Sequence, residues 1–244
     1  MDNQGKIAIV TGGTKGIGRG VTMELLRKGF FVIITYSTDT AAAEEIRSQV
    51  GDMHKRLSIM KVNHSCKNDV YSFCQQIKEV YSKIDVLICN AGHTNRKPYT
   101  DQSDEEFEQV MQVSLFSHNT IIRELFPLLS SSSQIVFIGS MMAIYPHAVS
   151  VAYGVAKAAV HALAINLVKE FDGLGTTVNV VAPGFVETEW QEGKSAEIRE
   201  SIYSKTAAGR FATIEEIVSA VNFCLSNSFV NGSVVEVSGG YNFK

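Results

Sequence analysis

The sequence predicts one doubly wound α/β domain, with a parallel sheet of about seven strands and helices on both faces. The first observation is that short, continuous apolar runs alternate with helical patterns from end to end, which is typical of parallel strands buried on both faces. The second is the length of 244 residues, which one α/β domain can take without splitting. The third is that no linker, low-complexity segment or fixed-period repeat interrupts the chain. We therefore treat 1–244 as a single domain of the Rossmann type, with strand order 3-2-1-4-5-6 and a further edge strand.

The apolar runs have the length and flanking residues of buried strands. They predict strands at Lys6–Val10, Phe31–Thr35, Leu57–Lys61, Asp85–Ile88, Ile135–Gly139, Thr177–Val181 and Ser233–Val237. Between them, apolar side chains recur every three or four residues, which predicts helices. These helices span Ile17–Lys28, Thr40–Val50, Val70–Val80, a long stretch from Ser103 to Leu125, Val151–Phe171, and a segment starting at Thr213. Ser103 with Glu106, and Thr213 with Glu216, have the capping-box spacing that starts a helix.

Composition and charge exclude several classes of protein. The formal net charge is −3 and no Lys/Arg run occurs, so no nucleic-acid partner is expected. No apolar run is expected to be long enough to cross a membrane, and the polar start Met1–Lys6 is unlike a signal peptide. The four scattered cysteines predict reduced thiols in a cytoplasmic protein. The six histidines lack ligand spacing, so no metal site is expected.

A glycine-rich turn, Thr11–Gly18, follows the first strand and opens the first helix. Its glycines have GxxxGxG spacing rather than the GxGxxG of the dinucleotide fingerprint. Such a turn lets a pyrophosphate approach the backbone, and the first amides of the helix bind the anion. Glycines also make plain turns, but the position between a strand and a helix favours binding. The candidate cofactor-binding residues here are Gly12, Thr14, Lys15, Gly16, Ile17 and Gly18.

The end of the second strand bears on the choice of cofactor. NAD enzymes commonly place an acidic residue there for the ribose hydroxyls, but Thr35–Thr38 is uncharged and the first acid is Asp39. An uncharged end tolerates a 2′-phosphate, and Lys15 in the turn is suited to pair with it. The plainer alternative is that Lys15 is a solvated surface lysine. We expect NADP(H) rather than NAD(H), with Ser37 in the binding site.

Tyr153 and Lys157 stand four residues apart at the start of a helical pattern, so their side chains share one face. A phenol has an ordinary pKa near 10, and a cation one turn away is expected to lower that pKa. Tyr153 would then exchange a proton with a substrate oxygen as a general acid/base. Ser140 ends the fifth strand, at the sheet edge where ligands bind, and would polarise that oxygen by a hydrogen bond.

These residues together resemble the short-chain dehydrogenase/reductase family over essentially the whole chain. The resemblance rests on motifs in the family's order and spacing: Thr11–Gly18, then Asn90, Ala91 and Gly92, then Ser140, Tyr153 and Lys157, then Pro183 and Gly184. Within the family, the chain is most similar to the 3-oxoacyl-(acyl-carrier-protein) reductases, as judged by Val180–Thr188 and the ending Val237–Gly240.

The resemblance implies an oxidoreductase that transfers a hydride between NADP(H) and a carbonyl or secondary alcohol on a small substrate. It implies that Ser140 orients the carbonyl, that Tyr153 is the general acid/base, and that Lys157 also binds the nicotinamide ribose. The cofactor-binding residues that it implies beyond the turn are Asn63, Asn90, Ala91, Gly92, Tyr153, Lys157, Pro183, Gly184, Val186 and Thr188. It also implies a homotetramer or homodimer, with the Ala/Val-rich helix Val151–Phe171 packing on a second copy.

The chain departs from the family pattern at several positions. Ser114 replaces an Asn that helps to hold a water relay behind the lysine: either the serine keeps part of that relay, or the helix is regular there and the relay is lost. Asn63 replaces an Asp that contacts adenine, and its amide oxygen still accepts a hydrogen bond. The stretches Ser130–Gln134 and Gly173–Thr176 lack Lys and Arg, which weakens the case for an acyl carrier protein as partner.

The substrate end of the site is less constrained by the sequence. The loop Met141–His147 is bulky and apolar, which suits an apolar substrate or plain packing. The resemblance implies that His93 and His147 lie near the cleft, where they contact substrate or, alternatively, are satisfied loop histidines. It also implies that the segment of about Glu189–Lys205, which has a helical pattern, is a lid anchored by Trp190; the alternative is a surface helix with one buried aromatic. A 3-oxoacyl thioester is the leading substrate class, with a sterol, sugar or polyol as alternatives. A non-catalytic NADP(H)-binding regulator is the rival interpretation.

Overall fold

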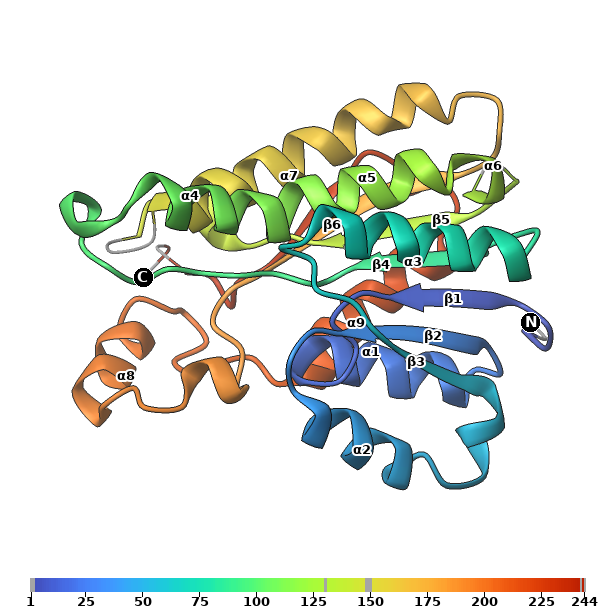
Figure 1. Cartoon of the computed structure of the whole chain (residues 1–244). Coiled ribbons are helices and arrows are strands. Elements are labelled where there is room, and N and C mark those ends of the chain that lie inside the picture. Colours follow the sequence, from blue (N-terminus) through green and yellow to red (C-terminus); the bar gives the residue numbers. More distant parts are fainter. Residues whose placement is uncertain (1–2, 130, 148–150, 242, 244) are drawn as a thin grey trace.

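The computed structural model describes residues 3–129, 131–147, 151–241 and 243, and within these it contains a seven-stranded parallel sheet (Figure 1). The strands are β1 (Ile7–Val10), β2 (Phe31–Tyr36), β3 (Leu57–Lys61), β4 (Val86–Cys89), β5 (Gln134–Ile138), β6 (Thr177–Pro183) and β7 (Val234–Val237). Their order, β3-β2-β1-β4-β5-β6-β7, confirms the predicted fold class and topology. From β1 the chain adds β2 and β3 on one side of the sheet, and it then crosses over to add β4 and the later strands on the other side. The boundary between β1 and β4 is therefore the topological switch point, where such folds bind ligands.

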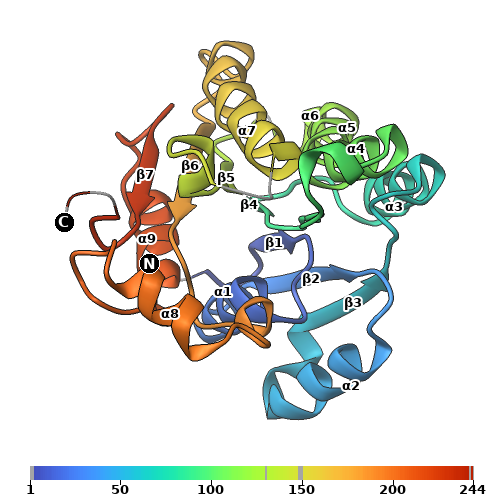
Figure 2. The ribbon, with the colours of Figure 1, turned by 90° about the vertical axis from the view of Figure 1, so that its left-hand side faces the viewer.

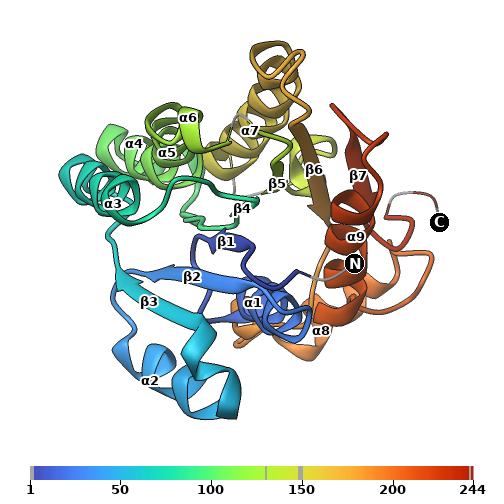
Figure 3. The same cartoon turned by 90° about the vertical axis from the view of Figure 1, so that its right-hand side faces the viewer.

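Helices cover both faces of the sheet, as the sequence predicts (Figure 3). One layer consists of α1 (Gly16–Arg27), α2 (Thr40–Gln49) and α9 (Ile214–Ser226), and the other of α3 (Lys67–Val80), α4 (Asp104–Met111), α5 (Ser117–Glu124) and α7 (Val151–Glu170). The short α6 (Phe126–Leu129) follows α5, and α8 (Ala196–Tyr203) lies near the carboxyl ends of the strands (Figures 1 and 2). Four short 3-10 helices are described as well: η1 (Gly51–Arg56), η2 (Tyr99–Asp101), η4 (Met141–Ala143) and η5 (Glu189–Gln191).

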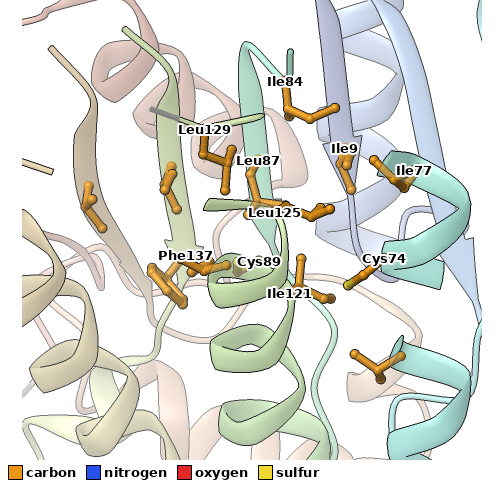
Figure 4. Packing of buried hydrophobic residues seen from close by; sticks show 14 of the residues in the cluster. Ile9, Cys74, Ile77, Ile84, Leu87, Cys89, Ile121, Leu125, Leu129 and Phe137 are labelled. Carbon is orange, nitrogen blue, oxygen red and sulfur yellow. The ribbon is translucent and has the colours of Figure 1, made fainter. Parts of the chain in front are cut away.

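The core consists of two apolar layers, one on each face of the sheet. Successive strand side chains point to opposite faces, so Leu87 and Cys89 of β4 pack against α3 and α5, whereas Val86 and Ile88 pack on the other side. Figure 4 shows part of the first layer, in which Ile77 of α3 lies beside Ile9 of β1. Because β4 is buried on both faces, it is uniformly apolar in sequence rather than alternating.

The predicted long helix from Ser103 to Leu125 is interrupted, which corrects the sequence interpretation. The capping box of Ser103 and Glu106 is present and starts α4. A π-helical turn, η3 (Gln112–Phe116), then separates α4 from α5. Such a turn inserts one extra residue into an α-helix, and apolar periodicity does not reveal it. As a result, Ser114 is fully buried on the inner side of the helix.

Helix α7 also corrects an expectation. In the described part of the chain it is long and apolar enough to cross a membrane by length and composition, with a hydropathy of 1.5, although no such run was expected. Its inner face nevertheless packs in the core through residues such as Val160 and Ala164, and it buries Lys157. Its outer face carries half-exposed apolar side chains, namely Val151, Val155 and Ile165.

Two buried histidines link the ends of β1 and β2 to η3 and to the start of α5. His118 Nε2 lies 3.0 Å from the hydroxyl of Thr11, and His64 Nε2 lies 3.0 Å from the hydroxyl of Thr35. The second ring nitrogen of each histidine also has a partner, on Ser114 O and Ser117 Oγ respectively. Burial lowers the pKa of His64 to about 4 and that of His118 to about 3, so both rings are neutral at pH 7.

We therefore expect the free energy of unfolding to fall as the pH drops from about 6.5 toward 4. The unfolded state takes up protons near the ordinary histidine pKa of about 6.5, before the folded state does, at up to about 1.4 kcal/mol per pH unit for each histidine. Carboxylates still titrate little above pH 5. Urea unfolding at pH 7.5, 6.0 and 5.0 measures the effect. His118→Asn should flatten this dependence while His54→Gln, at an exposed position, should not; an unchanged slope in His118→Asn contradicts the assignment.

Candidate active site

A cleft of about 770 Å³ opens at the carboxyl ends of the strands, within the size range of about 300–1,000 Å³ for small-molecule sites. Helix α8 lies at the same end of the molecule (Figure 2). The cleft brings together most of the predicted site residues: Gly12, Lys15, Gly16, Ile17, Ser37, Asn63, Asn90, Ala91, Gly92, Ser140, Tyr153, Lys157, Pro183, Gly184, Val186 and Thr188. Thr14 and Gly18 are buried and are not among the lining residues.

The turn after β1 is fixed to β4 by side-chain hydrogen bonds. Asn90 Nδ2 donates to the carbonyls of Thr11 and Gly12, both at 2.9 Å. The hydroxyl of Thr11 accepts from the amides of Asn90 and Ala91, at 2.9 and 3.0 Å. Gly18 lies directly behind this arrangement, where a Cβ would overlap the carbonyl oxygen of Gly12. The third glycine of the motif is thus required for packing of the turn rather than for contact with a ligand.

The residues at the turn fit a dinucleotide pyrophosphate. Helix α1 starts at Gly16 without a side-chain cap and without an acidic residue in its first turn, so its first amides remain available for an anion. Gly12 and Gly16 have positive φ angles of 63° and 49°, which an L side chain rarely adopts. From the turn, the lining of the cleft extends to Tyr153, as a dinucleotide requires.

Lys15 is exposed and forms an ion pair with Asp39, so the alternative of a surface lysine without a role in binding stays open. Asp39 also caps α2, accepting a hydrogen bond from the amide of Ala42 at 2.9 Å. The hydrogen bond from Lys15 lowers the pKa of Asp39, and the same contact raises the pKa of Lys15. Asp39 does not line the cleft, whereas Ser37 and Thr38 do.

Tyr153 and Ser140 lie together at the middle of the cleft. Burial raises the pKa of Tyr153 to about 12, against smaller lowering effects from its hydrogen bond with Ser140 and from the charge of Arg96. The sequence interpretation expected Lys157 to make this phenol more acidic. That expectation is wrong for the ligand-free protein, because desolvation of the phenolate is the larger effect. Tyr153 therefore keeps its proton at neutral pH.

Lys157 is almost fully buried, at 3% exposure. Its ammonium group donates to the carbonyl of Ile138 at 2.5 Å and lies 5.6 Å from the centre of the Tyr153 ring. Burial lowers the pKa of Lys157 to about 8, so the group is mostly charged at pH 7 and neutral in alkaline solution. Tyr153 and Lys157 share one face of α7, as their spacing predicts.

Ser114 lies behind Lys157, because η3 turns it inward. Its hydroxyl accepts from the amide of His93 at 3.2 Å and contacts the carbonyl of His93 at 3.4 Å. A Cβ added at Gly92 would lie 3.8 Å from Lys157 Nζ and 3.9 Å from Ser114 Oγ, so both polar groups flank this glycine. The alternative of a regular helix at Ser114 is thus wrong. A relay role for its hydroxyl stays a prediction.

The substrate end of the cleft contains both expected and unexpected residues. His93, His147 and Trp190 line it, and the Trp190 ring packs edge-on against Tyr153 with 6.1 Å between centroids. Sequence reasoning did not single out several of the lining residues, among them Arg96, Gln191 and Lys194. Arg96 had one available signal, since it follows Gly92 in the loop after β4, which begins at the carboxyl edge of the sheet.

Comparison with known proteins agrees with this geometry. A family model described as enoyl-(acyl carrier protein) reductase matches residues 12–242. The chain is 36% identical over 241 residues to a 3-oxoacyl-(acyl-carrier-protein) reductase, FabG, of Haemophilus influenzae, covering 97% of this chain and 98% of that protein. It is 27% identical over 244 residues to 2-dehydro-3-deoxy-D-gluconate 5-dehydrogenase of Pseudoalteromonas atlantica, covering 98% and 96%.

Among solved structures, the NADP complex of RhlG from Pseudomonas aeruginosa matches with a TM-score of 0.88 and 27% identity, covering 98% of this chain and 97% of that chain. Sequence motifs, sheet topology and these matches agree along nearly the whole chain. The chain therefore belongs to the short-chain dehydrogenase/reductase family of NAD(P)-dependent oxidoreductases.

Proposed function

We propose that this protein is an NADP(H)-dependent reductase that converts a carbonyl on a small substrate into a secondary alcohol, and the reverse. The observation that carries the proposal is the hydrogen-bonded pair of Ser140 and Tyr153 in the cleft, with the buried Lys157 beside it. The rival interpretation, a non-catalytic regulator, has only Ser114 in its favour, and the intact trio argues against it.

The proposed chemistry assigns one task to each group. The nicotinamide, when bound, supplies the hydride or accepts it. The Ser140 hydroxyl donates a hydrogen bond to the substrate carbonyl and aligns it. Tyr153, protonated at neutral pH, gives its proton to the oxygen as negative charge develops there. Lys157 stabilises the phenolate that remains, since its ammonium lies on the same helix face, and its charge also suits binding of a ribose hydroxyl.

NADP(H) is the proposed cofactor because the end of β2 offers no free carboxylate. Asp39 is engaged by Lys15 and by the cap of α2, so it is a poor acceptor for ribose hydroxyls. A 2′-phosphate beside Ser37 would compete with Asp39 for the Lys15 ammonium. The RhlG complex with NADP supports the same choice.

A 3-oxoacyl thioester is the first substrate class to test, because of the relationship to the Haemophilus reductase. A sugar-derived substrate is the second, because of the relationship to the gluconate-type dehydrogenase.

We further propose a cytoplasmic homodimer or homotetramer. The free, mostly buried thiols suit a reducing compartment, and the exposed apolar face of α7 suits a second copy. An acyl carrier protein as partner is a weaker proposal, because the sequence stretches Ser130–Gln134 and Gly173–Thr176 contain no Lys or Arg.

Replacing the phenol tests the proposed mechanism. Tyr153→Phe removes the proton donor while keeping the ring that packs on Trp190, so we expect kcat to fall by about a hundredfold to ten-thousandfold. NADPH oxidation with acetoacetyl thioesters and simple ketones measures turnover, and fluorescence titration measures NADPH binding, which should be retained. A variant with near-normal turnover would remove Tyr153 from the mechanism.

The titration of Lys157 predicts a pH profile. A lysine whose pKa is lowered to about 8 loses its charge as the pH rises through that value, so the phenolate loses its stabilisation and the reduction rate should drop toward tenfold per pH unit. Steady-state kcat between pH 6 and 10 measures this limb. Lys157→Arg keeps its charge over this range, so whatever activity it retains should not show the alkaline limb. An identical limb in that variant assigns the titration to another group.

The assignment of the cofactor rests on Lys15. We expect Lys15→Gln to weaken NADPH binding by about tenfold to a hundredfold, the value of one hydrogen bond between charged groups, and to leave NADH binding nearly unchanged. The matched control is Asp39→Asn, which keeps an N-cap for α2 and frees Lys15, so NADPH binding should be equal or tighter. Equal losses for NADH and NADPH in Lys15→Gln contradict the role.

A further inference from the structure

Two cations at the substrate end of the cleft have no acidic partner in the described part of the chain. Arg96 and Lys194 both line the cleft, and neither forms an ion pair among those residues. Lys157, at the middle of the cleft, also has no acidic partner among the described residues, but its ammonium donates to the carbonyl of Ile138. Other cations in this region are paired: Lys15 with Asp39, Lys97 with Glu106, Arg199 with Glu187 and Arg210 with Glu216. Unpaired charges of one sign facing a cleft attract a ligand of opposite charge.

The acidic residue that does line the cleft belongs to its other end. Glu189 lies next to the phosphate-binding turn, where a Cβ at Gly16 would be 3.6 Å from its carboxylate. Its charge also raises the pKa of Lys15. Glu189 therefore does not neutralise Arg96 or Lys194, and the positive charge at the substrate end is left for a ligand.

Arg96 is held close to the reacting groups. Its guanidinium donates to the carbonyl of Trp190 at 3.1 Å, and the Trp190 ring packs on Tyr153. The charge of Arg96 is also near enough to lower the pKa of Tyr153 and that of Lys194. An anion bound by Arg96 would thus lie a few bonds from a carbonyl aligned by Ser140 and Tyr153.

Gln191 supplies an independent indication of a polar ligand. It is 9% exposed, lines the cleft, and follows Trp190 directly. Its Oε1 is the one buried side-chain polar atom without a hydrogen-bond partner among the described residues. A buried acceptor left unpaired costs free energy, and a hydroxyl group on a bound ligand would satisfy it.

We propose that Arg96, Lys194 and Gln191 form a subsite for a short, hydroxylated keto acid, whose carboxylate binds the two cations and whose hydroxyl donates to Gln191 Oε1. This inference rests on the proposed carbonyl reductase activity and narrows its substrate class. Burial and the neighbouring cations Arg96 and Arg199 lower the pKa of Lys194, and a carboxylate in the subsite would offset that repulsion. The bound acid would therefore add a counter-charge that the free protein lacks.

A phosphate on a carrier arm is another source of negative charge. In a pantetheine thioester, however, the phosphate is separated from the reacting carbonyl by a long flexible chain. Arg96 contacts Trp190, and Trp190 in turn packs against Tyr153. A carboxylate on the substrate itself therefore matches the subsite better than a distant phosphate.

The test compares each keto acid with a neutral counterpart. Suitable pairs are 4-oxopentanoate with its methyl ester, acetoacetate with ethyl acetoacetate, and 5-keto-D-gluconate with L-sorbose. We expect the parent enzyme to favour the acid in kcat/KM by about tenfold or more in at least one pair. Arg96→Gln and Lys194→Gln should each reduce this ratio by about tenfold through KM. The ratio is the readout because any effect of Arg96 on the Tyr153 pKa is common to both members.

Lys97→Gln is the matched control, since it removes the same charge one residue from Arg96, at a position that is paired with Glu106 and is not among the lining residues. It should leave the ratio unchanged. Gln191→Leu should raise KM for 5-keto-D-gluconate more than for 4-oxopentanoate, with KM for NADPH unchanged. If the KM for NADPH rises instead, Gln191 faces the nicotinamide and the hydroxyl assignment is wrong.

Separate outcomes overturn the inference and the proposed function. The subsite alone is wrong if neutral ketones are turned over and the ratio of kcat/KM for the acid to that for its neutral counterpart is near one. The same holds if Arg96→Gln and Lys194→Gln leave this ratio unchanged. A loss in these variants confined to acetoacetyl-CoA, absent for acetoacetyl-N-acetylcysteamine and for the acids, assigns the cations to a carrier phosphate instead. No turnover of any carbonyl despite NADPH binding overturns the proposed function itself.

Discussion

The cleft depends on the hydrogen bonds that join the ends of β1 and β4. Asn90 donates to two consecutive carbonyls of the turn, and the hydroxyl of Thr11 accepts from two consecutive amides of the segment after β4. These contacts meet at the switch point of the sheet, where the chain changes direction of winding. They satisfy backbone groups that would otherwise be buried without partners, and they hold the helix amides and the Asn90–Gly92 segment at one edge of the cleft.

Burial has opposite consequences for the two ionisable groups at the centre of the site. It disfavours the phenolate of Tyr153 and the ammonium of Lys157 alike, so the pKa of the phenol rises while that of the lysine falls. Both pKa shifts thus favour the neutral form of the group concerned. A proton donor that is held in its neutral form suits the direction of reduction, in which the substrate oxygen gains the proton.

Much of the fold could be predicted from the sequence because strands such as β2, β4 and β5 are buried on both faces and so are predominantly apolar. The strand order followed from the alternation of apolar runs with helical patterns. Gly12 followed from a glycine-rich turn placed between a strand and a helix, whereas Asn90 followed from the family resemblance. The interruption at η3 could not be predicted, since Val110, Leu115 and Ile121 keep an apolar pattern that fits a regular helix. The Lys15–Asp39 pair joins separate loops, and the direction of the Tyr153 pKa depends on burial that spacing alone does not contain. Arg96 and Lys194 lie in loops and Gln191 ends the single turn η5, and segments this short have no periodicity that signals which side chains face inward.

The π-helical turn η3 has a consequence for the helical layer around it. An α-helix advances 100° about its axis for each residue, so the extra residue between α4 and α5 sets the two halves of this helical segment at different rotations. Val110 can then pack near α7 while Ile121 and Leu125 face the sheet. Removing a single residue from Gln112–Phe116 would make the helix regular and turn one half away from its neighbours. Length is therefore more constrained at this point of the chain than side-chain identity.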